Sequence, residues 1–280
     1  MRGEQNADMQ TRPTETLESL CLCGLLPSLT AETPAALVKG LAALMELGFP
    51  VVEVEAVSGW LSEPQQSVLS QCLGMAVGVR TTSRANALAW LARGAAWATC
   101  PSGLAAQDGE QTGVHEVLML PHGEVQESTA AQLMQSPSLL AMRRQVHVTV
   151  DNAQAVAEEM HAQWVASLGF TLMHIGINAE GAAEASGIAG QFASLLGAAV
   201  IDGAQNSFAG TLVEVMKSGG RGLHGHIGFG TSDLPRAMYY AERKGFAFDP
   251  ASRKNDAEGN AILYYLAQDI AGFAVHLLQR

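Results

Sequence analysis

The chain has 280 residues, of which 48% are hydrophobic and 15% are charged, and its formal net charge is −11 at pH 7. This length and apolar content predict two compact domains, each with enough apolar residues to form a core. The acidic balance argues against nucleic acid as a partner, because phosphate backbones are bound by clustered lysine and arginine.

The first fifteen residues are polar, contain Pro13 and lack an apolar run, so we expect a disordered tail over 1–15 rather than a signal peptide. No stretch of the sequence has the apolar length needed to cross a bilayer, so we expect no membrane partner and a cytoplasmic location. The low charged content suggests an apolar surface shared between subunits, which predicts a homo-oligomer such as a homodimer.

In the N-terminal half, apolar runs bounded by turn residues alternate with helical patterns rich in alanine and leucine. This alternation predicts a parallel α/β sheet or barrel. Thr33 and Pro34 supply a cap and a first-turn proline for the first long helix. The expected strands are 20–26, 51–57, 75–79, 95–100, 117–120 and 145–150, and the expected helices are 34–47, 65–73, 84–93 and 152–168.

Three stretches, 46–54, 77–81 and 93–101, carry a resemblance to a known family. On the basis of these stretches, the chain from about Leu20 to Gly103 resembles the (β/α)8 barrel of the 2-keto-3-deoxy-6-phosphogluconate and 2-keto-4-hydroxyglutarate aldolases. The resemblance implies an aldolase-like domain over 16–168, in which Glu53 matches the proton-transfer glutamate of the second barrel strand.

The chain departs from that aldolase pattern at the catalytic lysine. Such aldolases need a lysine on an inner strand to form a Schiff base. The only lysines are Lys39, in an expected helix, and Lys217, Lys244 and Lys254, in the C-terminal half. The segment 111–169 is also too short for four further strand and helix units. We therefore expect an incomplete, degenerate TIM-like barrel that has lost aldol chemistry.

Two further departures concern single positions of the same pattern. Val57 stands where the family has an arginine, and no Thr-Gly-Gly phosphate-binding turn is found. Glu53 is then either a relic base or a member of an ion pair.

The C-terminal region contains an internal repeat, whose two copies open on His174 and His226, 52 residues apart. Each copy runs from a strand into a helical pattern, over 183–196 and 234–245, and then into β-prone segments. The closing strands are expected at 211–217 and 273–279. The modules are expected at 170–218 and 223–280, within a domain over 169–280.

Four polar side chains stand alone among apolar neighbours on the opening and closing strands of the two copies: His174, Glu214, His226 and His276. Because side chains alternate between the faces of a strand, all four can share one concave face. The apolar neighbours then build the core behind that face.

This pattern resembles the vicinal-oxygen-chelate, or glyoxalase-like, superfamily, in which two βαβββ modules curl around one divalent metal. The resemblance implies that His174, Glu214, His226 and His276 are the metal ligands. Three imidazoles and one carboxylate suit Zn, Ni, Co, Mn or Fe(II), without selecting among them.

The combined interpretation is a metal-dependent lyase or isomerase of the vicinal-oxygen-chelate type, acting on a small keto or hydroxy acid. Glu214 is the acidic ligand able to act as the general base. One alternative is a non-catalytic protein that binds and sequesters a small molecule such as a keto acid. A further alternative is a lyase related to the keto-acid aldolases.

Other residues are expected near the metal site. Arg221 lies in the glycine-rich connector between the copies, where it is a candidate for binding a substrate carboxylate. Asn206, Ser207, Phe208 and Tyr264 are candidates for lining the cleft. The remaining histidines show no ligand spacing.

Overall fold

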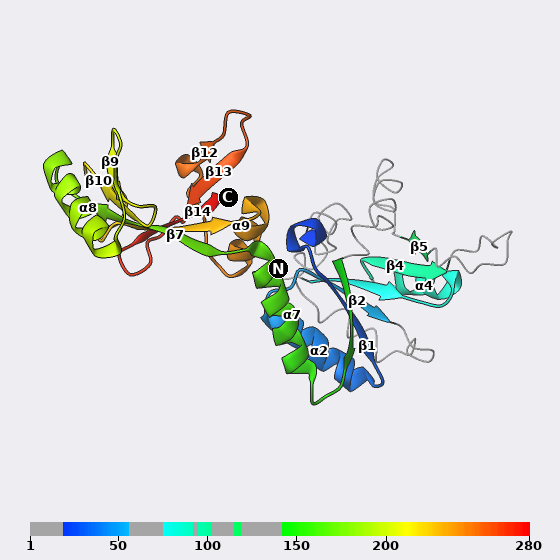
Figure 1. Cartoon of the computed structure of the whole chain (residues 1–280). Helices are drawn as coiled ribbons and strands as arrows, with labels where there is room; N and C mark the ends of the chain where they lie inside the picture. Colours follow the sequence, from blue (N-terminus) through cyan, green and yellow to red (C-terminus); the bar gives the residue numbers. More distant parts are fainter. Residues whose placement is uncertain (1–18, 56–74, 92–94, 102–114, 119–141) are drawn as a thin grey trace, which may run out of the picture. The chain divides into compact units, whose positions relative to one another are not determined.

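The computed structural model describes residues 19–55, 75–91, 95–101, 115–118 and 142–280 (Figure 1). The chain forms two compact units, Met1–Trp164 and Val165–Arg280, and the boundary falls within helix α7 (Ala153–Leu168). The expected tail over 1–15 and the expected helix over 65–73 lie outside the described residues.

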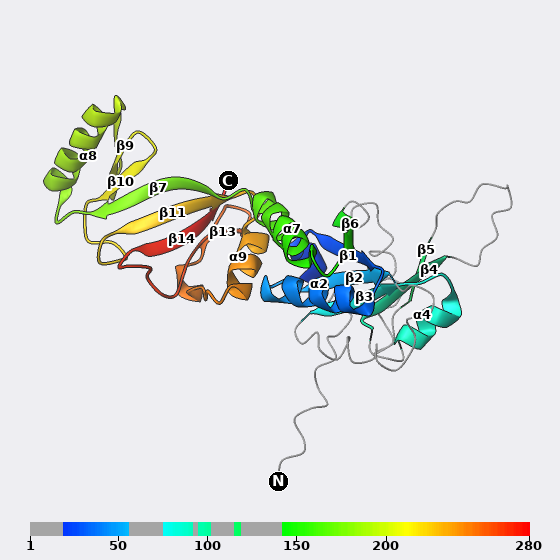
Figure 2. The ribbon, with the colours of Figure 1, turned by 90° about the horizontal axis from the view of Figure 1, so that it is seen from below.

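The N-terminal unit is built on a six-stranded sheet with the order β5-β4-β3-β2-β1-β6 (Figure 2). Pairing is parallel throughout except between β4 and β5. The strands are β1 (Leu26–Ala31), β2 (Val51–Glu55), β3 (Ala76–Arg80), β4 (Trp97–Pro101), β5 (His115–Leu118) and β6 (Arg143–Val148). The expected alternation of strands and helices is confirmed, with α2 (Pro34–Glu46) and α4 (Arg84–Leu91) between the strands.

The expected strand over 20–26 is wrong, because residues 19–23 are helical and β1 begins only at Leu26. Gly24 separates the two segments: its φ of 66° is a left-handed conformation, and its N–H donates to the carbonyl of Leu20. A glycine in this conformation is a common helix terminator. The apolar run from Leu20 therefore contains the end of a helix and the start of a strand.

A complete barrel is not shown. Among the described strands, β6 pairs with β1 in parallel, but β5 runs antiparallel to β4, whereas a TIM barrel contains only parallel strands. The N-terminal unit is a mixed α/β unit with a largely parallel sheet.

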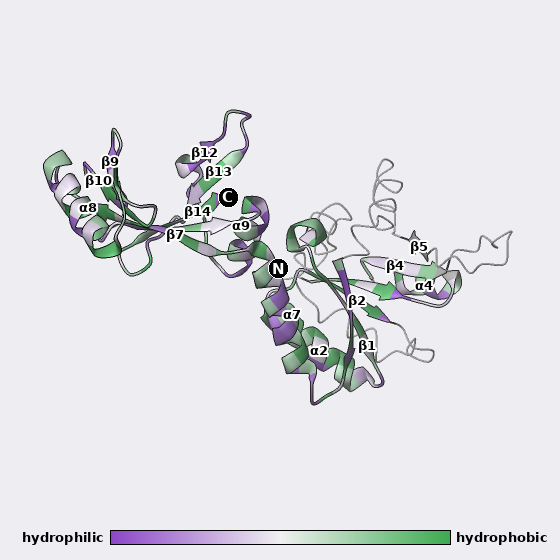
Figure 3. Ribbon diagram, viewed as in Figure 1, coloured by the Kyte–Doolittle hydropathy of each residue, from purple (hydrophilic) through white to green (hydrophobic). Residues whose placement is uncertain are grey.

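The two faces of this sheet differ in polarity. On one face, apolar side chains pack under helices: Ala98 and Cys100 of β4 contact Ala87 and Leu91 of α4. Figure 3 shows α2 mostly in hydrophobic colours, as expected for a helix whose Leu37, Leu41 and Leu44 are buried. The opposite face combines a small apolar cluster around Trp97 with polar residues.

The C-terminal unit is built on an eight-stranded mixed sheet with the order β12-β13-β14-β11-β7-β10-β9-β8. Strand, helix and three strands follow one another twice, which confirms the expected order of elements. The first copy holds β7 (Thr171–Asn178), α8 (Ala182–Leu196), β8 (Val200–Asp202), β9 (Asn206–Ala209) and β10 (Val213–Met216). The second holds β11 (His226–Thr231), α9 (Leu234–Arg243), the short helix η2 (Pro250–Ser252), β12 (Lys254–Asn255), β13 (Ala261–Tyr265) and β14 (Ala274–Gln279).

Each copy packs its helix on the sheet through small or apolar residues. Ala185, Ala189 and Ala193 of α8 lie against Val213 and Val215. In the second copy, Leu234 and Ala237 of α9 lie against Leu277 of β14. Since neighbouring side chains alternate between faces, the opposite face of these strands is left for the repeated histidines. No helix in the described ranges is long and apolar enough to cross a membrane.

Gly78 of β3 provides a test of the packing in the N-terminal unit. A Cβ atom added to Gly78 would lie 1.8–2.3 Å from three atoms of the buried Trp97 indole. We predict that Gly78→Ala destabilises this unit by about 1–3 kcal/mol, because the ring has to move out of a packed core. Denaturant unfolding followed by tryptophan fluorescence measures this change, since all four tryptophans lie in this unit.

The matched control is the same substitution at Gly187 of α8, where an added Cβ meets no atom within 4 Å. At this exposed helical position, alanine is expected to stabilise the C-terminal unit by about 0.5–1 kcal/mol, which is measured through the tyrosines, since all of them lie in that unit. A Gly78→Ala protein as stable as the parent would contradict the described packing of Trp97.

Candidate metal centre

Four strands of the C-terminal sheet carry the site, in the order β14-β11-β7-β10. Strand β7 runs antiparallel to β11, with His174 opposite Gly228 and Gly176 opposite His226. Each outer strand is parallel to its own neighbour. Strand β14 runs parallel to β11 and places His276 beside Gly228, and β10 runs parallel to β7 and places Glu214 beside Gly176. Each histidine of the central pair thus faces the glycine two residues after the other histidine.

The glycines leave room for the imidazole rings. A Cβ atom added to Gly176 would lie 2.0–2.4 Å from three ring atoms of His226. A Cβ atom added to Gly228 would lie within 2.7–2.9 Å of atoms in both the His174 and the His276 rings. Larger residues here would push the rings apart, so the two glycines allow them to converge.

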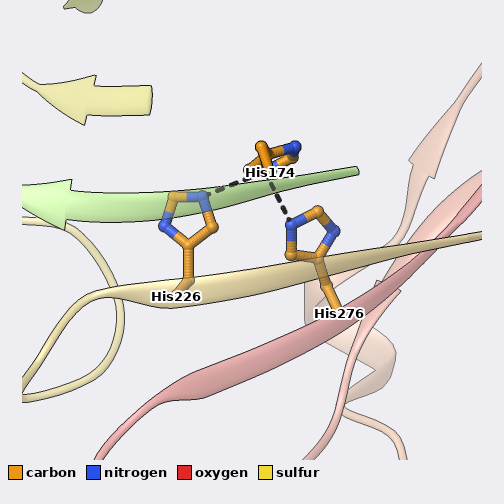
Figure 4. A group of neighbouring side chains, drawn as sticks. All are labelled: His174, His226 and His276. Carbon is orange, nitrogen blue, oxygen red and sulfur yellow. Dashed lines mark hydrogen bonds between the residues drawn. The ribbon is translucent and has the colours of Figure 1, made fainter. Parts of the chain in front are cut away.

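The structure brings all four sequence-predicted residues together (Figure 4 shows the three histidines). The Nε2 atom of His174 lies 3.2 Å from Nε2 of His226 and 3.2 Å from Nε2 of His276. Ligand atoms of the three rings all lie within 4.8 Å of one another. Glu214 Oε2 lies 3.1 Å from Nε2 of His226 and 3.3 Å from Nε2 of His174.

This set of atoms fits a divalent cation. A neutral imidazole nitrogen has either one hydrogen or one lone pair, so Nε2 of His174 cannot make good hydrogen bonds to both other Nε2 atoms. In a tetrahedral site with ligand bonds of about 2.0–2.1 Å, neighbouring ligand atoms are about 3.3 Å apart. Four of the separations, at 3.1–3.3 Å, match this spacing. The three histidines form the cluster that could hold a cation, and the Glu214 carboxylate contacts two of them.

Two of the imidazoles, those of His174 and His276, are favoured in the neutral form that binds a metal. Burial lowers the pKa of His276 to about 3, and the neighbouring His174 and His226 add to the shift. The pKa of His174 is lowered as well, chiefly by burial, although the Glu214 carboxylate opposes the change. Since metals bind the neutral imidazole, proton competition at these two residues is weak at neutral pH.

Glu214 is held as a carboxylate with its two oxygens in different surroundings. Oε1 accepts a hydrogen bond from Nδ2 of Asn206, while Oε2 faces the histidines. Burial is the largest influence on the pKa of Glu214 and raises it, but the hydrogen bonds with His226 and Asn206, together with nearby His174, lower it overall. Glu214 is therefore ionised at neutral pH.

Aromatic rings surround the histidines. The ring of Tyr265 lies 4.7 Å from the His276 ring at 35°, and Phe208 meets His174 edge-on at 6.3 Å. Within the described part of the chain, Nδ1 of His276 is buried without a hydrogen-bond partner. Metal-binding histidines usually have their second nitrogen held by an acceptor. In place of such an acceptor, the Tyr265 ring packs against the His276 ring.

Only some of the residues expected to line the cleft lie at the site. Asn206 and Phe208 lie at the site. Ser207 does not, because it is buried beside Val215 in the β9–β10 pairing and donates a hydrogen bond to Asp202. Tyr264 does not: it packs in the apolar cluster around α9, because its neighbour Tyr265 is the residue opposite His276 in the β13–β14 pairing. Tyr265 was missed because the exact register of β13 cannot be read from the sequence.

Arg221 lies near the site but already has partners. Its guanidinium group forms an ion pair with Asp249 at 2.9 Å and lies 4.8 Å from the centre of the Tyr265 ring. Binding of a substrate carboxylate by Arg221 stays a prediction. The arginine connects the loop between the copies to Tyr265, and so to His276.

Glu53, the expected counterpart of the aldolase base, lies in the other unit and is fully buried. Its Oε1 is 2.9 Å from Nη2 of Arg143, and its Oε2 accepts a hydrogen bond from Ser28. Of the two readings left open by the sequence, the structure shows the ion pair.

Comparisons with known proteins add little to this geometry. No protein-family model and no curated protein matches the chain. Among solved structures, a hypothetical protein, BH1468 from Bacillus halodurans, is 14% identical with a TM-score of 0.30, covering 40% of this chain and 95% of its own. A methylmalonyl-CoA epimerase from Mycobacterium tuberculosis is 12% identical with a TM-score of 0.27, covering 39% and 86%. Similarity at this level carries no argument about function.

The shifted pKa of His276 predicts how the stability of the metal-free unit depends on pH. In the unfolded chain this histidine takes up a proton near its ordinary value of 6.5, whereas in the folded protein it does so only near 3. Stability is therefore fully present above pH 6.5 and falls as the pH falls below it, by up to about 1.4 kcal/mol per pH unit for this group.

Denaturant unfolding between pH 6.5 and 5, with a chelator present, measures this slope through the tyrosines, which all lie in the C-terminal unit. His276→Gln removes the titrating group, so its stability should depend less steeply on pH, whatever its absolute value. Equal slopes for the parent and His276→Gln would contradict the described burial of His276.

Proposed function

We propose that the C-terminal unit is a metal-dependent lyase or isomerase of the vicinal-oxygen-chelate type, acting on a small keto or hydroxy acid. The observation that carries the proposal is the cluster of three imidazole nitrogens within 4.8 Å of one another, with a carboxylate oxygen of Glu214 within 3.3 Å of two of them. The proposed ligands are His174, Glu214, His226 and His276, and the proposed ion is Zn, Ni, Co, Mn or Fe(II).

A bound divalent ion would supply a Lewis acid that polarises two adjacent substrate oxygens and makes the neighbouring C–H more acidic. The protein supplies the base. Glu214 is ionised, and Asn206 binds its Oε1, while Oε2 faces the histidines. The carboxylate would act as the base through Oε2 after swinging away from the ligand position, so that this oxygen is free to take the proton from substrate carbon. Phe208 and Tyr265 place aromatic rings against His174 and His276.

We propose further that the N-terminal unit is a degenerate relative of the keto-acid aldolases without Schiff-base chemistry. Lys39 is exposed on α2, and the other three lysines belong to the C-terminal unit. No lysine thus lies on a strand of the six-stranded sheet. Glu53 is bound by Arg143 and Ser28 rather than free to accept a proton.

Metal binding is the first test. We predict that the purified protein, stripped with a chelator and reloaded, binds one divalent ion per chain by elemental analysis. His226→Ala should weaken the affinity by about 100-fold or more, since one of four ligands is lost. His147→Ala is the matched control, because His147 is an exposed histidine of the other unit.

A protein that retains no metal after reloading, or whose His226→Ala variant binds as tightly as the parent, has no metal centre at this place.

The role of Glu214 is the second test. We predict that Glu214→Gln lowers the rate of proton abstraction by about 10²–10⁴-fold while leaving the fold intact, because Gln has the same shape but is not a base. Exchange of the C2 hydrogen of small 2-hydroxy acids, and of the C3 hydrogens of 2-keto acids, into deuterated water measures this step directly. Exchange as fast with Glu214→Gln as with the parent would rule out Glu214 as the base.

The same panel separates an enzyme from a sequestering protein. A loaded parent that is stabilised by these acids but exchanges no hydrogen binds without catalysis, which would replace the proposed activity with storage or sequestration.

A further inference from the structure

The polar face of the sheet in the N-terminal unit contains two arginines, Arg143 at the start of β6 and Arg80 at the end of β3. These two strands flank β1 and β2. Arg143 opens β6 and pairs with Leu26, two residues before Ser28. Arg80 closes β3 and pairs with Glu55, two residues after Glu53. Since Ser28 and Glu53 are paired with each other, the two guanidinium groups extend toward the same level of the sheet.

Each arginine crosses neighbouring strands to reach its partner. Arg143, on β6, passes β1 to contact Glu53 of β2 at 2.9 Å. Arg80 of β3 passes β2 and β1 in the other direction: with its amide turned so that the oxygen faces the arginine, Gln145 of β6 accepts a hydrogen bond from Nη2 of Arg80 at 2.8 Å. Both guanidinium groups therefore have a partner that lies across β1 from their own strand.

Donors on this face are left without acceptors. In the part of the chain that the structure describes, Nε of Arg80, Nε of Arg143 and Oγ1 of Thr99 are buried and have no hydrogen-bond partner. Thr99 is only 2% exposed, and it pairs with Arg80 across the β3–β4 ladder, so its side chain shares the face of the arginine. Buried donors of this kind are rare in native proteins and call for an acceptor.

The chemistry of the acceptor follows from the donors and the charge. The Nε edge of a guanidinium group is suited to binding a planar oxyanion through two parallel hydrogen bonds. Each arginine meets one carboxylate, Glu53 or Glu55, through a single Nη2 atom, which leaves the Nε groups free. The two arginines and two glutamates balance in charge, so a monoanion is accommodated more easily than a doubly charged phosphate.

From this arrangement we infer a second ligand site, distinct from the metal centre: a site for a short monocarboxylate, bound non-covalently by Arg80, Arg143 and Thr99. Glu53 orients Arg143 and is itself held by Ser28. The ring of Trp97 lies over Gly78, next to Glu53 in the sheet, and so reports on changes at the site.

The test is a titration of the full chain with acetate and propanoate, in the presence of a chelator, followed by tryptophan fluorescence and calorimetry. We expect one molecule bound per chain, with inorganic phosphate and sulfate binding at least about tenfold more weakly. His226→Ala, which disables the proposed metal centre, should bind the monocarboxylates as the parent does. Failure of the metal centre and failure of this site are therefore distinguishable.

Two variants locate the site. Thr99→Val removes a hydroxyl that has no partner in the described structure, so the ligand-free protein should keep or gain thermal stability, while affinity for acetate should fall about tenfold or more. Arg80→Gln should lower the affinity at least as much, and the partners that lose their arginine are the half-exposed Glu55 and the exposed Gln145. Absence of binding to the parent, or unchanged affinity in both variants, would overturn the inference. Loss of binding in His226→Ala would place the anion at the other site and overturn it as well.

Discussion

The antiparallel pairing of β7 with β11 is the constraint on which the rest of the site depends. Both strands contain the same three residues, His-Ile-Gly, and the pairing sets His174 against Gly228 and His226 against Gly176. Had the two strands slipped by one residue, the side chains would lie on opposite faces. In the observed register, each ring lies over a position without a side chain, which lets three imidazoles meet.

Buried polar groups are handled differently in the two units. In the N-terminal unit, Glu53 is matched by Arg143 and hydrogen-bonded by Ser28, so its charge is compensated within the protein. In the C-terminal unit, a lone carboxylate, Glu214, lies in a cluster of histidines, and burial favours the neutral form of two of them, His174 and His276. Such a cluster has electron pairs in excess of hydrogens, which suits a cation far better than it suits an empty core.

The sequence was sufficient for the repeat, for the order of elements and for the four residues that meet at the site, because isolated polar residues on apolar strands are a strong signal. It was insufficient for features that depend on register or on distant partners. Tyr265 rather than Tyr264 faces His276 because of how β13 pairs with β14, and Arg221 is bound by Asp249, a residue of the second copy. The end of the helix at Gly24 was missed because the apolar run from Leu20 continues across it. The repeated glycines were visible, but their role appears only once the strands are paired.

X-ray absorption spectroscopy of the protein loaded with one equivalent of Zn²⁺ tests the central claim most directly. The account predicts nitrogen and oxygen ligands at about 2.0–2.1 Å, with the outer-shell scattering of three imidazoles. In His226→Ala the same spectrum should show two imidazoles. A spectrum of the loaded parent without imidazole scattering, or one unchanged in His226→Ala, would contradict a metal centre built from these strands.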